Sequence, residues 1–506
     1  MKIITLILTL LLSTNLLADN YFCKKDLESL PIQQGGRVKP LYVHASEMMK
    51  MLTGKSKVND LSAVEAFCLL SINGMGIKTD VTLNARIDHV DLMKFLGLEK
   101  DQHSMNFEEL VARFESLRNE ARTIKDNQSY RTAISNLMNA INTYQEIKVG
   151  NNWMLAEQAG NEINWVPLTA YLTDAKVMAQ KSISTDEPIL PVLMQSKATY
   201  IAALGDKYIV ELYYAKLQLA NWSLVITLIA LASLVLFKNF KIALGFTFLS
   251  IITQLVFVTL RVIISGRAPI TNMYETVLVS GLGSLILAVL LGHFKKEKVF
   301  IYMGLGYNLC TLMMITFANG MLTATISPLV PVLRDNFWLS THVTTIMLSY
   351  GALALSWVMA NGALFKRKFR TLDRQEEVRL GEVIYTTLKY GTTMLAAGII
   401  LGGVWADYSW GRFWGWDPKE TWSLIVLCIY IAILHGRYTN WIKTDRFIAI
   451  TAGAFMSVMM AWFGVNYILA TGLHSYGFSE GGAVFLGSFF LLQVGFLVIT
   501  RVKKLS

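Results

Sequence analysis

The residues of this chain that are best suited to chemistry lie in one stretch, which reads Trp-Gly-Arg-Phe-Trp-Gly-Trp-Asp-Pro-Lys-Glu-Thr-Trp from Trp410 to Trp422. Widened to residues 405–422, the stretch contains five of the protein's twelve tryptophans, together with acidic and basic side chains. Tryptophan belts at membrane surfaces are spread over many loops rather than gathered in one. Indole faces interleaved with charges instead suit a large planar ligand, because rings stack on it and Arg or Lys binds its carboxylates. An aromatic belt at a tight Gly/Pro turn is the alternative interpretation.

Three histidines outside this stretch are candidate iron ligands. His342 and His474 each lie near the end of an apolar segment. His435 follows Trp422 by 13 residues on one such segment, which is ~20 Å at the helical rise of 1.5 Å per residue. Haem iron bound from both sides needs two neutral imidazoles facing each other across the ring. A lone histidine at a membrane end is more often an interfacial polar residue, but two of them beside a tryptophan-rich loop favour ligation.

Membrane helices must position these residues. With 53% hydrophobic residues and a mean hydropathy of +0.43, the chain is too apolar for a soluble enzyme. Several apolar runs have the length of about 20 residues that a membrane helix needs. The sequence therefore predicts an all-α, polytopic membrane bundle with about nine spans, at residues 217–237, 242–264, 274–293, 298–319, 341–365, 383–404, 419–436, 447–469 and 482–501.

The net charge of +10 is explained by membrane orientation rather than by nucleic-acid binding. Residues 19–215 carry 21 Lys+Arg against 24 Asp+Glu, whereas residues 216–506 carry 24 against 12. If residues 19–215 are external, the loops on the cytoplasmic side hold 17 Lys+Arg and the opposite loops hold five. This asymmetry follows the positive-inside rule. It places the tryptophan-rich loop, His342 and His474 on the external face and the C-terminus inside.

The first 215 residues form a separate, more polar region. Residues 1–18 have the pattern of a secretory signal peptide, with an uncleaved anchor as the alternative, and residues 19–215 are predicted to be an external, mainly helical domain. His44, His89 and His103 are expected at its surface or at helix caps. The four cysteines form no Cys-x-x-Cys pair, which argues against a thiol oxidoreductase or a carrier of covalent haem. Cys23 and Cys68 form a disulfide only if the domain is exported, and that alternative stays open.

Two further external loops carry charges near the tryptophan-rich loop. Arg267 and Arg334 could each bind a ligand carboxylate or serve as simple interfacial charges, and the residues do not decide between the two. Glu275 lies at the start of a span, where the helix dipole favours a carboxylate.

Four separated motifs together resemble the CcsA/ResC branch of the haem-handling family of cytochrome c biogenesis. The tryptophan-rich signature is matched over its whole length, and three shorter segments are similar to further family segments in the family order. These segments are Asn272-Met-Tyr-Glu275, Trp338-Leu-Ser-Thr-His342 and Gly472-Leu-His474-Ser-Tyr-Gly477. The resemblance covers about residues 255–501 and leaves the first 215 residues outside the minimal family module.

The resemblance implies a set of haem-binding residues. His342 and His474 would be axial ligands of a non-covalent haem b at the external site, and His435 would be one ligand of an inner haem. The loop of residues 405–422, called the WWD loop in this family, would lie against the macrocycle through Trp410, Arg412, Trp414, Trp416, Asp417 and Trp422. No catalytic residue on this chain is implied.

The implied function is to move haem outward across the bacterial inner membrane and attach it to apocytochrome c at a Cys-x-x-Cys-His segment. The chain would act as one half of a cytochrome c synthase, with a CcsB/ResB-type membrane protein supplying the opposing inner histidine and a thiol-reducing pathway preparing the substrate. Two alternatives remain: a haem-delivery protein that hands haem to a chaperone without ligation, and a non-catalytic membrane scaffold subunit. A respiratory or transport subunit would need ionisable residues along its spans, and these spans carry few.

Overall fold

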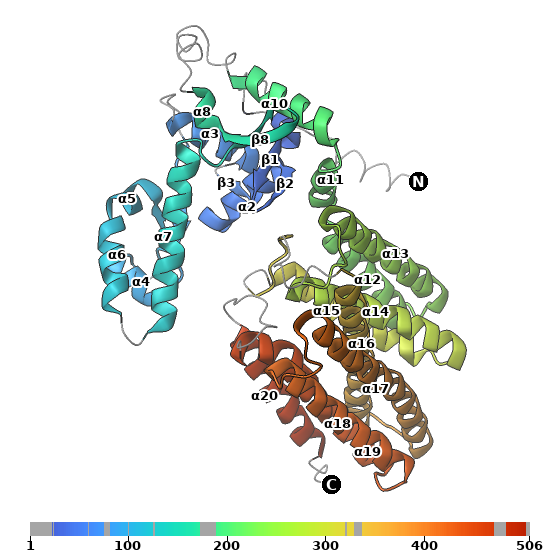
Figure 1. Ribbon diagram of the computed structural model, residues 1–506. Coiled ribbons are helices and arrows are strands. Elements are labelled where there is room, and N and C mark those ends of the chain that lie inside the picture. Colours follow the sequence, from blue (N-terminus) through green and yellow to red (C-terminus); the bar gives the residue numbers. More distant parts are fainter. Residues whose placement is uncertain are drawn as a thin grey trace. The chain divides into compact units, whose positions relative to one another are not determined.

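The computed structural model describes residues 23, 25–58, 60–74, 81–99, 101–124, 127–172, 189–318, 321–327, 336–469 and 482–501 (Figure 1). By its internal contacts the chain divides into two units, Met1–Ala215 and Lys216–Ser506. The signal segment predicted at residues 1–18 and the candidate ligand His474 lie outside the described residues.

The first unit combines helices with four short antiparallel hairpins, β1-β2, β3-β4, β5-β6 and β7-β8. Its described elements are η1 Lys25–Ser29, β1 Pro31–Gln34, β2 Arg37–Pro40, α2 Leu41–Thr53, β3 Lys57–Val58, β4 Leu61–Ser62, α3 Ala63–Gly74, β5 Asn84–Arg86, α4 Val90–Leu96, β6 Ser104–Asn106, α5 Phe107–Ala112, α6 Phe114–Thr123, α7 Gln128–Lys148, β7 Met154–Ala159, β8 Glu162–Pro167, α8 Leu168–Leu172, α10 Ile189–Leu204 and α11 Ile209–Leu217. The helices agree with the mainly helical character predicted for residues 19–215, and the hairpins were not predicted.

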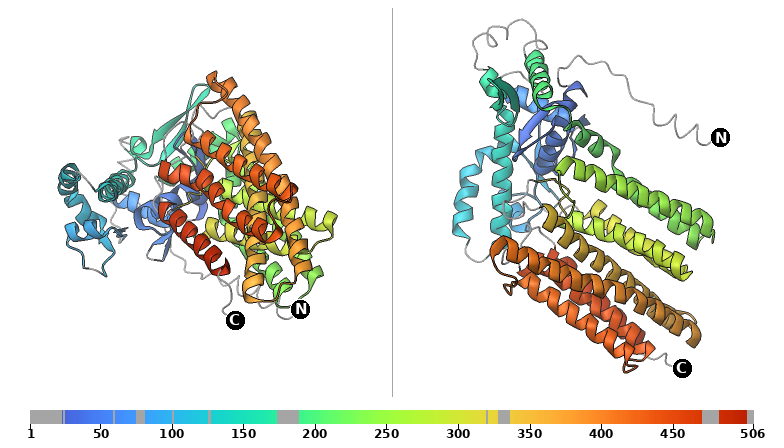
Figure 2. Two further views of the ribbon diagram at one scale, coloured as in Figure 1. Left: turned by 90° about the horizontal axis from the view of Figure 1, so that it is seen from below. Right: turned by 45° about the vertical axis from the view of Figure 1, so that its right-hand side comes forward.

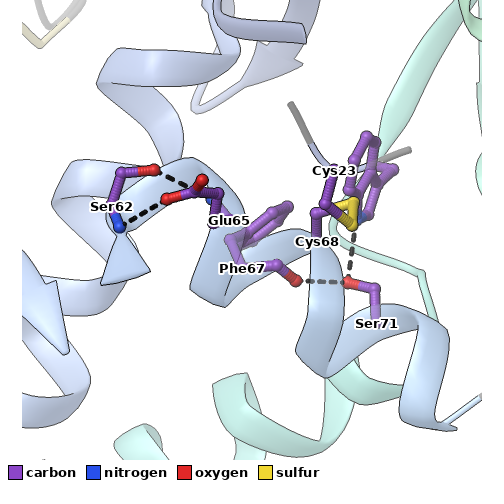
Figure 3. Close-up of a disulfide and its surroundings, with 7 residues drawn as sticks. Cys23, Ser62, Glu65, Phe67, Cys68 and Ser71 are labelled. Carbon is purple, nitrogen blue, oxygen red and sulfur yellow. Dashed lines mark hydrogen bonds between the residues drawn. A yellow bond between two sulfur atoms is a disulfide. The ribbon is translucent and has the colours of Figure 1, made fainter. Parts of the chain in front are cut away.

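A disulfide between Cys23 and Cys68 joins the start of the described chain to α3, with a Cα–Cα distance of 5.6 Å (Figure 3). Helix α3 begins at a capping box, because the Ser62 backbone N–H donates to the Glu65 carboxylate and the Glu65 N–H donates to the Ser62 hydroxyl. The sulfurs lie in the main apolar core of this unit. The disulfide that the sequence left open is therefore present.

His44 in α2 is fully buried rather than at the surface or at a helix cap. Its Nδ1 lies 2.7 Å from the Gln34 side-chain oxygen and its Nε2 lies 3.1 Å from the Asn152 carbonyl. Burial, reinforced by the nearby Lys39 ammonium, lowers the pKa of His44 to about 3. The expectation of a surface or capping histidine was wrong here, because the sequence pattern did not show that this face of α2 enters the core.

The second unit is a bundle of long helices that lie side by side (Figures 1 and 2). They are α12 Leu219–Val235, α13 Phe240–Ser265, α14 Met273–Lys295, α15 Val299–Phe317, α16 Asn336–Phe369, α17 Arg374–Trp410, α18 Pro418–Tyr438, α19 Thr444–Met459, the π-helix η3 Met460–Leu469, and α20 Gly482–Arg501. Eight helices among the described residues are long and apolar enough to span a membrane. The one predicted span that is not among these eight, 383–404, lies in α17, which is 37 residues long but less apolar. The predicted polytopic helical fold is confirmed.

Helix α16 lies at the centre of this bundle and contacts α14, α15, α17, α19 and α20. Small residues allow the close approach. A Cβ at Gly351 of α16 would lie 2.7 Å from the Ser280 carbonyl oxygen of α14, so only glycine fits there. Close backbone contact at small residues is how membrane helices associate without a hydrophobic driving force.

The two ends of the bundle differ in their chemistry. At the end where α16 stops and α17 begins, ion pairs join helix termini: Lys366–Glu376, Arg367–Glu377, Arg379–Glu297 and Arg437–Glu382. At the opposite end, α17 stops and α18 begins, and the connecting loop is the tryptophan-rich stretch.

Candidate functional site

A pocket opens at the tryptophan-rich end of the bundle, where α14 and α18 begin and α17 and η3 end. Its empty volume is ≈ 980 Å³ when the open mouth is included. Its aromatic lining residues are Tyr350, Trp405, Phe413, Trp414 and Trp462. Its polar lining residues are Thr271, Asn272, Thr276, His342, Lys419, Glu420, Ser423 and Asn466.

His342 reaches this pocket from the first third of α16. Its Nδ1 lies 2.8 Å from the Gly398 carbonyl oxygen of α17. A carbonyl only accepts, so the neutral ring carries its proton on Nδ1 and its lone pair on Nε2. Gly402, one turn further along α17, makes room for the ring, because a Cβ there would lie 2.5 Å from His342 Cε1. This is how proteins orient a histidine that ligates a metal through Nε2.

The tryptophans next to His342 form a connected group. The Trp405 ring lies 5.9 Å from the His342 ring and 5.6 Å from the Trp410 ring, measured between centroids. Trp405 is 1% exposed. The indole nitrogens of Trp405 and Trp414 are buried and have no hydrogen-bond partner among the described residues. Because a buried N–H normally has an acceptor, both indoles are suited to a ligand that supplies one.

The loop between α17 and α18 is shaped by its own hydrogen bonds. Helix α17 ends at Trp410 and is capped by Gly411, whose φ of +67° is left-handed. Trp416 also has a left-handed φ, of +56°. Asp417 then caps α18: its side chain accepts from the Glu420 N–H at 2.8 Å, and Glu420 accepts from the N–H groups of Gly415 and Asp417 in return. The acidic residues of the Asp-Pro-Lys-Glu segment therefore cap α18, a structural role that was not predicted from the sequence.

The π-helix η3 places two further side chains in the pocket. Trp462 donates from Nε1 to the Thr276 hydroxyl at 3.2 Å. Asn466 donates to the Trp462 carbonyl at 2.6 Å and to the Met273 sulfur at 3.1 Å, while its side-chain oxygen accepts from Lys419 Nζ at 3.4 Å. These bonds join η3 to the starts of α14 and α18. π-helical turns are rare and frequently occur at functional sites.

Comparison with known proteins places this end of the bundle in a family. Residues 270–474 match the family model of the cytochrome C assembly protein. The cytochrome c biogenesis protein CcsA of Guillardia theta is 32% identical over 287 residues, which cover 50% of this chain and 93% of that protein. The chain belongs to the CcsA family. Protein NrfI of Wolinella succinogenes is 37% identical over 226 residues, covering 43% of this chain and 24% of NrfI. Among solved structures, the cytochrome c haem lyase CcmF matches with a TM-score of 0.40 and 17% identity, covering 59% of this chain and 52% of that one.

Membership of the CcsA family confirms the predicted role in cytochrome c maturation with haem handling. It also confirms that the chain is a membrane protein of the pathway that brings haem and apocytochrome together. Every residue that lines the pocket falls between Ile270 and Asn466, inside residues 270–474, which match the model of the cytochrome C assembly protein. The pocket is therefore a feature of the family segment and not of the N-terminal region.

The structure brings together only part of the residue set predicted for a CcsA-like site. Of that set, His342 and Trp414 line the pocket. Trp410 contacts Trp405 behind it, and Trp416, 70% exposed, lies edge-on to Trp414. The remaining loop candidates, Arg412, Asp417 and Trp422, are not among the lining residues.

The other iron-ligand candidate that the structure describes, His435, does not line the pocket, and His474 lies outside the described residues. His435 is exposed in the last turn of α18, at the end of the bundle opposite the pocket. The described part of this CcsA-family chain contains no cluster of three or more His, Cys, Asp or Glu side chains that could hold a metal ion.

Arg267, one of the two arginines predicted as possible partners of a ligand carboxylate, has protein partners in the structure. Arg267 is buried and pairs with Glu275, and it donates to the Ser327 carbonyl at 2.8 Å. Arg261 donates to the same Glu275 at 2.7 Å and to the Ala324 carbonyl at 3.0 Å. These bonds connect the 321–327 segment to α13 and α14. Arg334 lies outside the described residues.

Sequence reasoning selected only His342 and Trp414 of the lining residues as ligand contacts; those it did not select include Trp405, Phe413, Lys419 and Asn466. The first three lie within the tryptophan-rich stretch. The sequence therefore pointed to this stretch but not to which of its side chains line the pocket. Asn466 lies on an apolar span, and an amide 2% exposed in such a span is the signal that could have identified it.

Proposed function

We propose that the pocket binds haem b non-covalently and presents it to an apocytochrome c for attachment. The observation that carries this proposal is the position of His342, whose Nε2 lone pair is set by the Gly398 hydrogen bond, in a pocket lined by aromatic rings. Haem needs an apolar, planar site with an imidazole on its iron and hydrogen-bond donors for its carboxylates. The buried indole N–H groups of Trp405 and Trp414 belong to this donor set.

The second axial ligand in this proposal is His474, which the sequence assigns to the same external face. Iron held by two neutral imidazoles is stabilised against side reactions until the substrate arrives. The histidine of the substrate's Cys-x-x-Cys-His segment then replaces one of them. The rest of the haem-facing loop is shaped by Trp410, Arg412, Trp416, Asp417 and Trp422.

His435 supports an inner haem site with a second protein. It is exposed on α18. Most of the apolar part of this helix is not covered by the rest of the chain, because only 22% of it is buried. An exposed imidazole on an uncovered membrane helix suits an interface, and the opposing histidine would come from a CcsB/ResB-type partner. Haem would enter at this site and move to the external pocket.

The attachment reaction adds each substrate thiol across a haem vinyl group. One S–C bond forms, the thiol proton passes to the other vinyl carbon, and no net oxidation occurs. The nucleophiles belong to the apocytochrome, so the chain acts by positioning and orientation. The cysteines must arrive reduced, which requires a thiol-reducing pathway. On this proposal the chain is one half of a cytochrome c synthase.

The proposed location is the bacterial inner membrane, with the first unit and the WWD loop in the periplasm and the C-terminus in the cytoplasm. The Cys23–Cys68 disulfide supports an oxidising compartment for the first unit. The Lys+Arg asymmetry of the loops supports the same orientation independently.

The test is to purify the full chain with a CcsB/ResB-type partner and record its haem absorption spectrum and cytochrome c yield. We expect that His342→Gly weakens ligation and lowers the yield, and that added imidazole restores both by filling the space of the missing ring. His103→Gly, which changes an exposed histidine of the first unit, is the matched control.

Unchanged spectrum and yield in His342→Gly would contradict the proposal. Haem bound with a normal spectrum but transferred only to a chaperone would favour a delivery protein without ligation. A complex that never contains haem would favour a structural subunit.

A further inference from the structure

Two neighbouring helix turns, at the end of the bundle where α16 stops, carry five exposed lysines. They are Lys238 and Lys241 around the turn from α12 to α13, and Lys295, Lys296 and Lys298 around the turn from α14 to α15. Helix α12 packs against both α13 and α15. The Lys298 ammonium lies 4.9 Å from the centroid of the Phe240 ring, which joins the two turns directly. The five lysines therefore form one surface, which we call the lysine patch.

The positive charge of the lysine patch is not balanced by acidic side chains of the two turns. Residues 236–241 and 293–298 contain one acidic residue, Glu297. Its carboxylate accepts from Arg379 of α17 at 2.8 Å. The ion pairs described at this end of the bundle use other cations, which are Lys366, Arg367, Arg379 and Arg437. A concentration of like charge of this kind attracts an anionic partner.

Local structure does not account for these lysines. Lys238 and Lys296 have left-handed φ values of +51° and +55°, a conformation that glycine adopts more easily at the end of a helix. Lys241 lies in the first turn of α13 and Lys298 is the N-cap of α15, where the helix dipole disfavours a cation. Helix capping and the dipole therefore explain Lys295, in the last turn of α14, but not the other four.

The apolar side chains beside the patch indicate which anionic partner fits. Phe237 and Phe294 each precede a lysine and are 76% and 73% exposed. Leu236 and Ile242 are also exposed and continue into the exposed apolar surfaces of α12 and α13. In a membrane such surfaces contact acyl chains, so the lysines at their end lie at the level of the lipid headgroups. An acidic soluble protein would bind the lysines but leave the two phenylalanines uncovered.

We propose that the lysine patch binds the headgroup phosphate of an anionic phospholipid, whose acyl chains contact Phe237 and Phe294. Basic surfaces between membrane helices are suited to such headgroups. One lipid bound across both turns would hold the α12–α13 and α14–α15 pairs together at this end, above the apolar cluster that already joins the four helices. This role is separate from haem binding, because none of the patch residues lines the pocket.

The test compares two lipid probes with identical acyl chains, phosphatidylglycerol and phosphatidylcholine. Binding of each to the purified full chain in detergent is titrated by native mass spectrometry. We expect wild type to bind phosphatidylglycerol at least about tenfold more tightly, because each lysine near an anionic headgroup contributes roughly fivefold. Lys241→Gln/Lys298→Gln should lose most of this preference. Its affinity for phosphatidylcholine should stay the same, which shows that the bundle is intact.

Two matched variants complete the design. Lys241→Arg/Lys298→Arg keeps both charges and should keep the preference. Lys443→Gln/Arg446→Gln removes two exposed charges around the start of α19, at the same end of the bundle, and should keep it as well.

Four results would overturn the proposal. These are equal affinity of wild type for the two lipids, an undiminished preference in Lys241→Gln/Lys298→Gln, an equal loss in Lys443→Gln/Arg446→Gln, and loss of both lipids in the first of these variants. An acidic protein that copurifies with wild type but not with Lys241→Gln/Lys298→Gln, in the absence of any lipid preference, would assign the patch to a protein partner instead.

Discussion

The imidazole of His342 occupies space that a side chain at position 402 would need. A Cβ on Gly402 would lie 2.5 Å from Cε1 and 2.9 Å from Nδ1 of the ring, so Gly402→Ala must displace the imidazole or separate α16 from α17. Overpacking of this kind costs about 1–3 kcal/mol, which corresponds to about a 5- to 150-fold loss of haem affinity if the cost falls on the ligand-bound state. We expect this loss in a haem titration. Gly306→Ala, where a Cβ meets nothing within 4 Å, should bind haem as wild type does.

His44 makes the stability of the first unit depend on pH. Its pKa is about 3 when folded and about 6.5 when unfolded, so below pH 6.5 the unfolded chain binds a proton that the folded chain does not. Stability is therefore complete above pH 6.5 and falls as the pH is lowered toward 3. Between pH 7.5 and 5.0 we expect a loss of about 2 kcal/mol, measured by urea unfolding of the full chain.

His44→Gln is the variant that isolates this effect. It has no titrating group at this position, and its amide can still bond to Gln34 or the Asn152 carbonyl. The pH dependence of unfolding should be shallower than in wild type by most of that amount, even if the variant is less stable at pH 7.5. Parallel pH profiles for the two proteins would contradict the assignment.

For single residues, the sequence predicted which side chains could act as ligands better than it predicted what surrounds each side chain. His342 was selected as a ligand from its place beside a tryptophan-rich loop, and it does line the pocket. His44 was expected at the surface because its sequence neighbours do not reveal that it lies in the core. Arg267 could not be decided, since its partner Glu275 is eight residues away and the Ser327 carbonyl is 60 residues away. Contacts at such separations depend on helix packing.

Among the elements, α13 and α15 are joined by a reciprocal amide pair inside the membrane. Gln254 donates to the Asn308 oxygen at 3.1 Å, and Asn308 donates back at 2.9 Å. Both side chains are fully buried, and Thr227 of α12 also donates to Asn308. We expect Asn308→Leu to lower the free energy of unfolding by about 1 kcal/mol, because it leaves the buried Gln254 side-chain oxygen without its Asn308 donor, whereas the Gln254 N–H groups still donate to Ser250.

A double-mutant cycle separates this interaction from simple packing. Gln254→Leu with Asn308→Leu should be destabilised by less than the sum of the two single variants, since removing both partners leaves no buried amide unpaired. Thermal unfolding in one detergent provides the comparison. Strictly additive losses would show that the pair contributes no coupling between α13 and α15.

The helices and strands were predicted correctly where the length of an apolar run determines the element. They were not predicted where polar contacts determine it. The span predicted at 341–365 belongs to α16, Asn336–Phe369, which continues past the apolar run to the Lys366–Glu376 pair. Hydropathy does not register such an extension. The hairpins of the first unit have strands of two to six residues, too short for a clear alternating pattern. The π-helical conformation of η3 follows from packing, and its sequence reads as an ordinary apolar helix.

For the whole molecule, the division of charge gives each end of the bundle a different environment. The basic, ion-paired helix ends suit the cytoplasmic side, and the pocket with the WWD loop would then face the periplasm. The disulfide of the first unit is consistent with the same orientation. These two arguments are independent, because one depends on membrane insertion and the other on the redox state of a compartment.

Cysteine labelling on whole cells tests this orientation in the full chain. Ser409 is exposed in the last turn of α17, at the pocket end, and Trp441 is 81% exposed between α18 and α19, at the opposite end. In a Cys310→Ser/Cys428→Ser background, Ser409→Cys should react with a membrane-impermeant maleimide in intact spheroplasts. Trp441→Cys should react only after the membrane is permeabilised. The reverse pattern would place the pocket in the cytoplasm, where a haem site built to meet an exported apocytochrome could not act, and the proposed direction of haem movement would have to be abandoned.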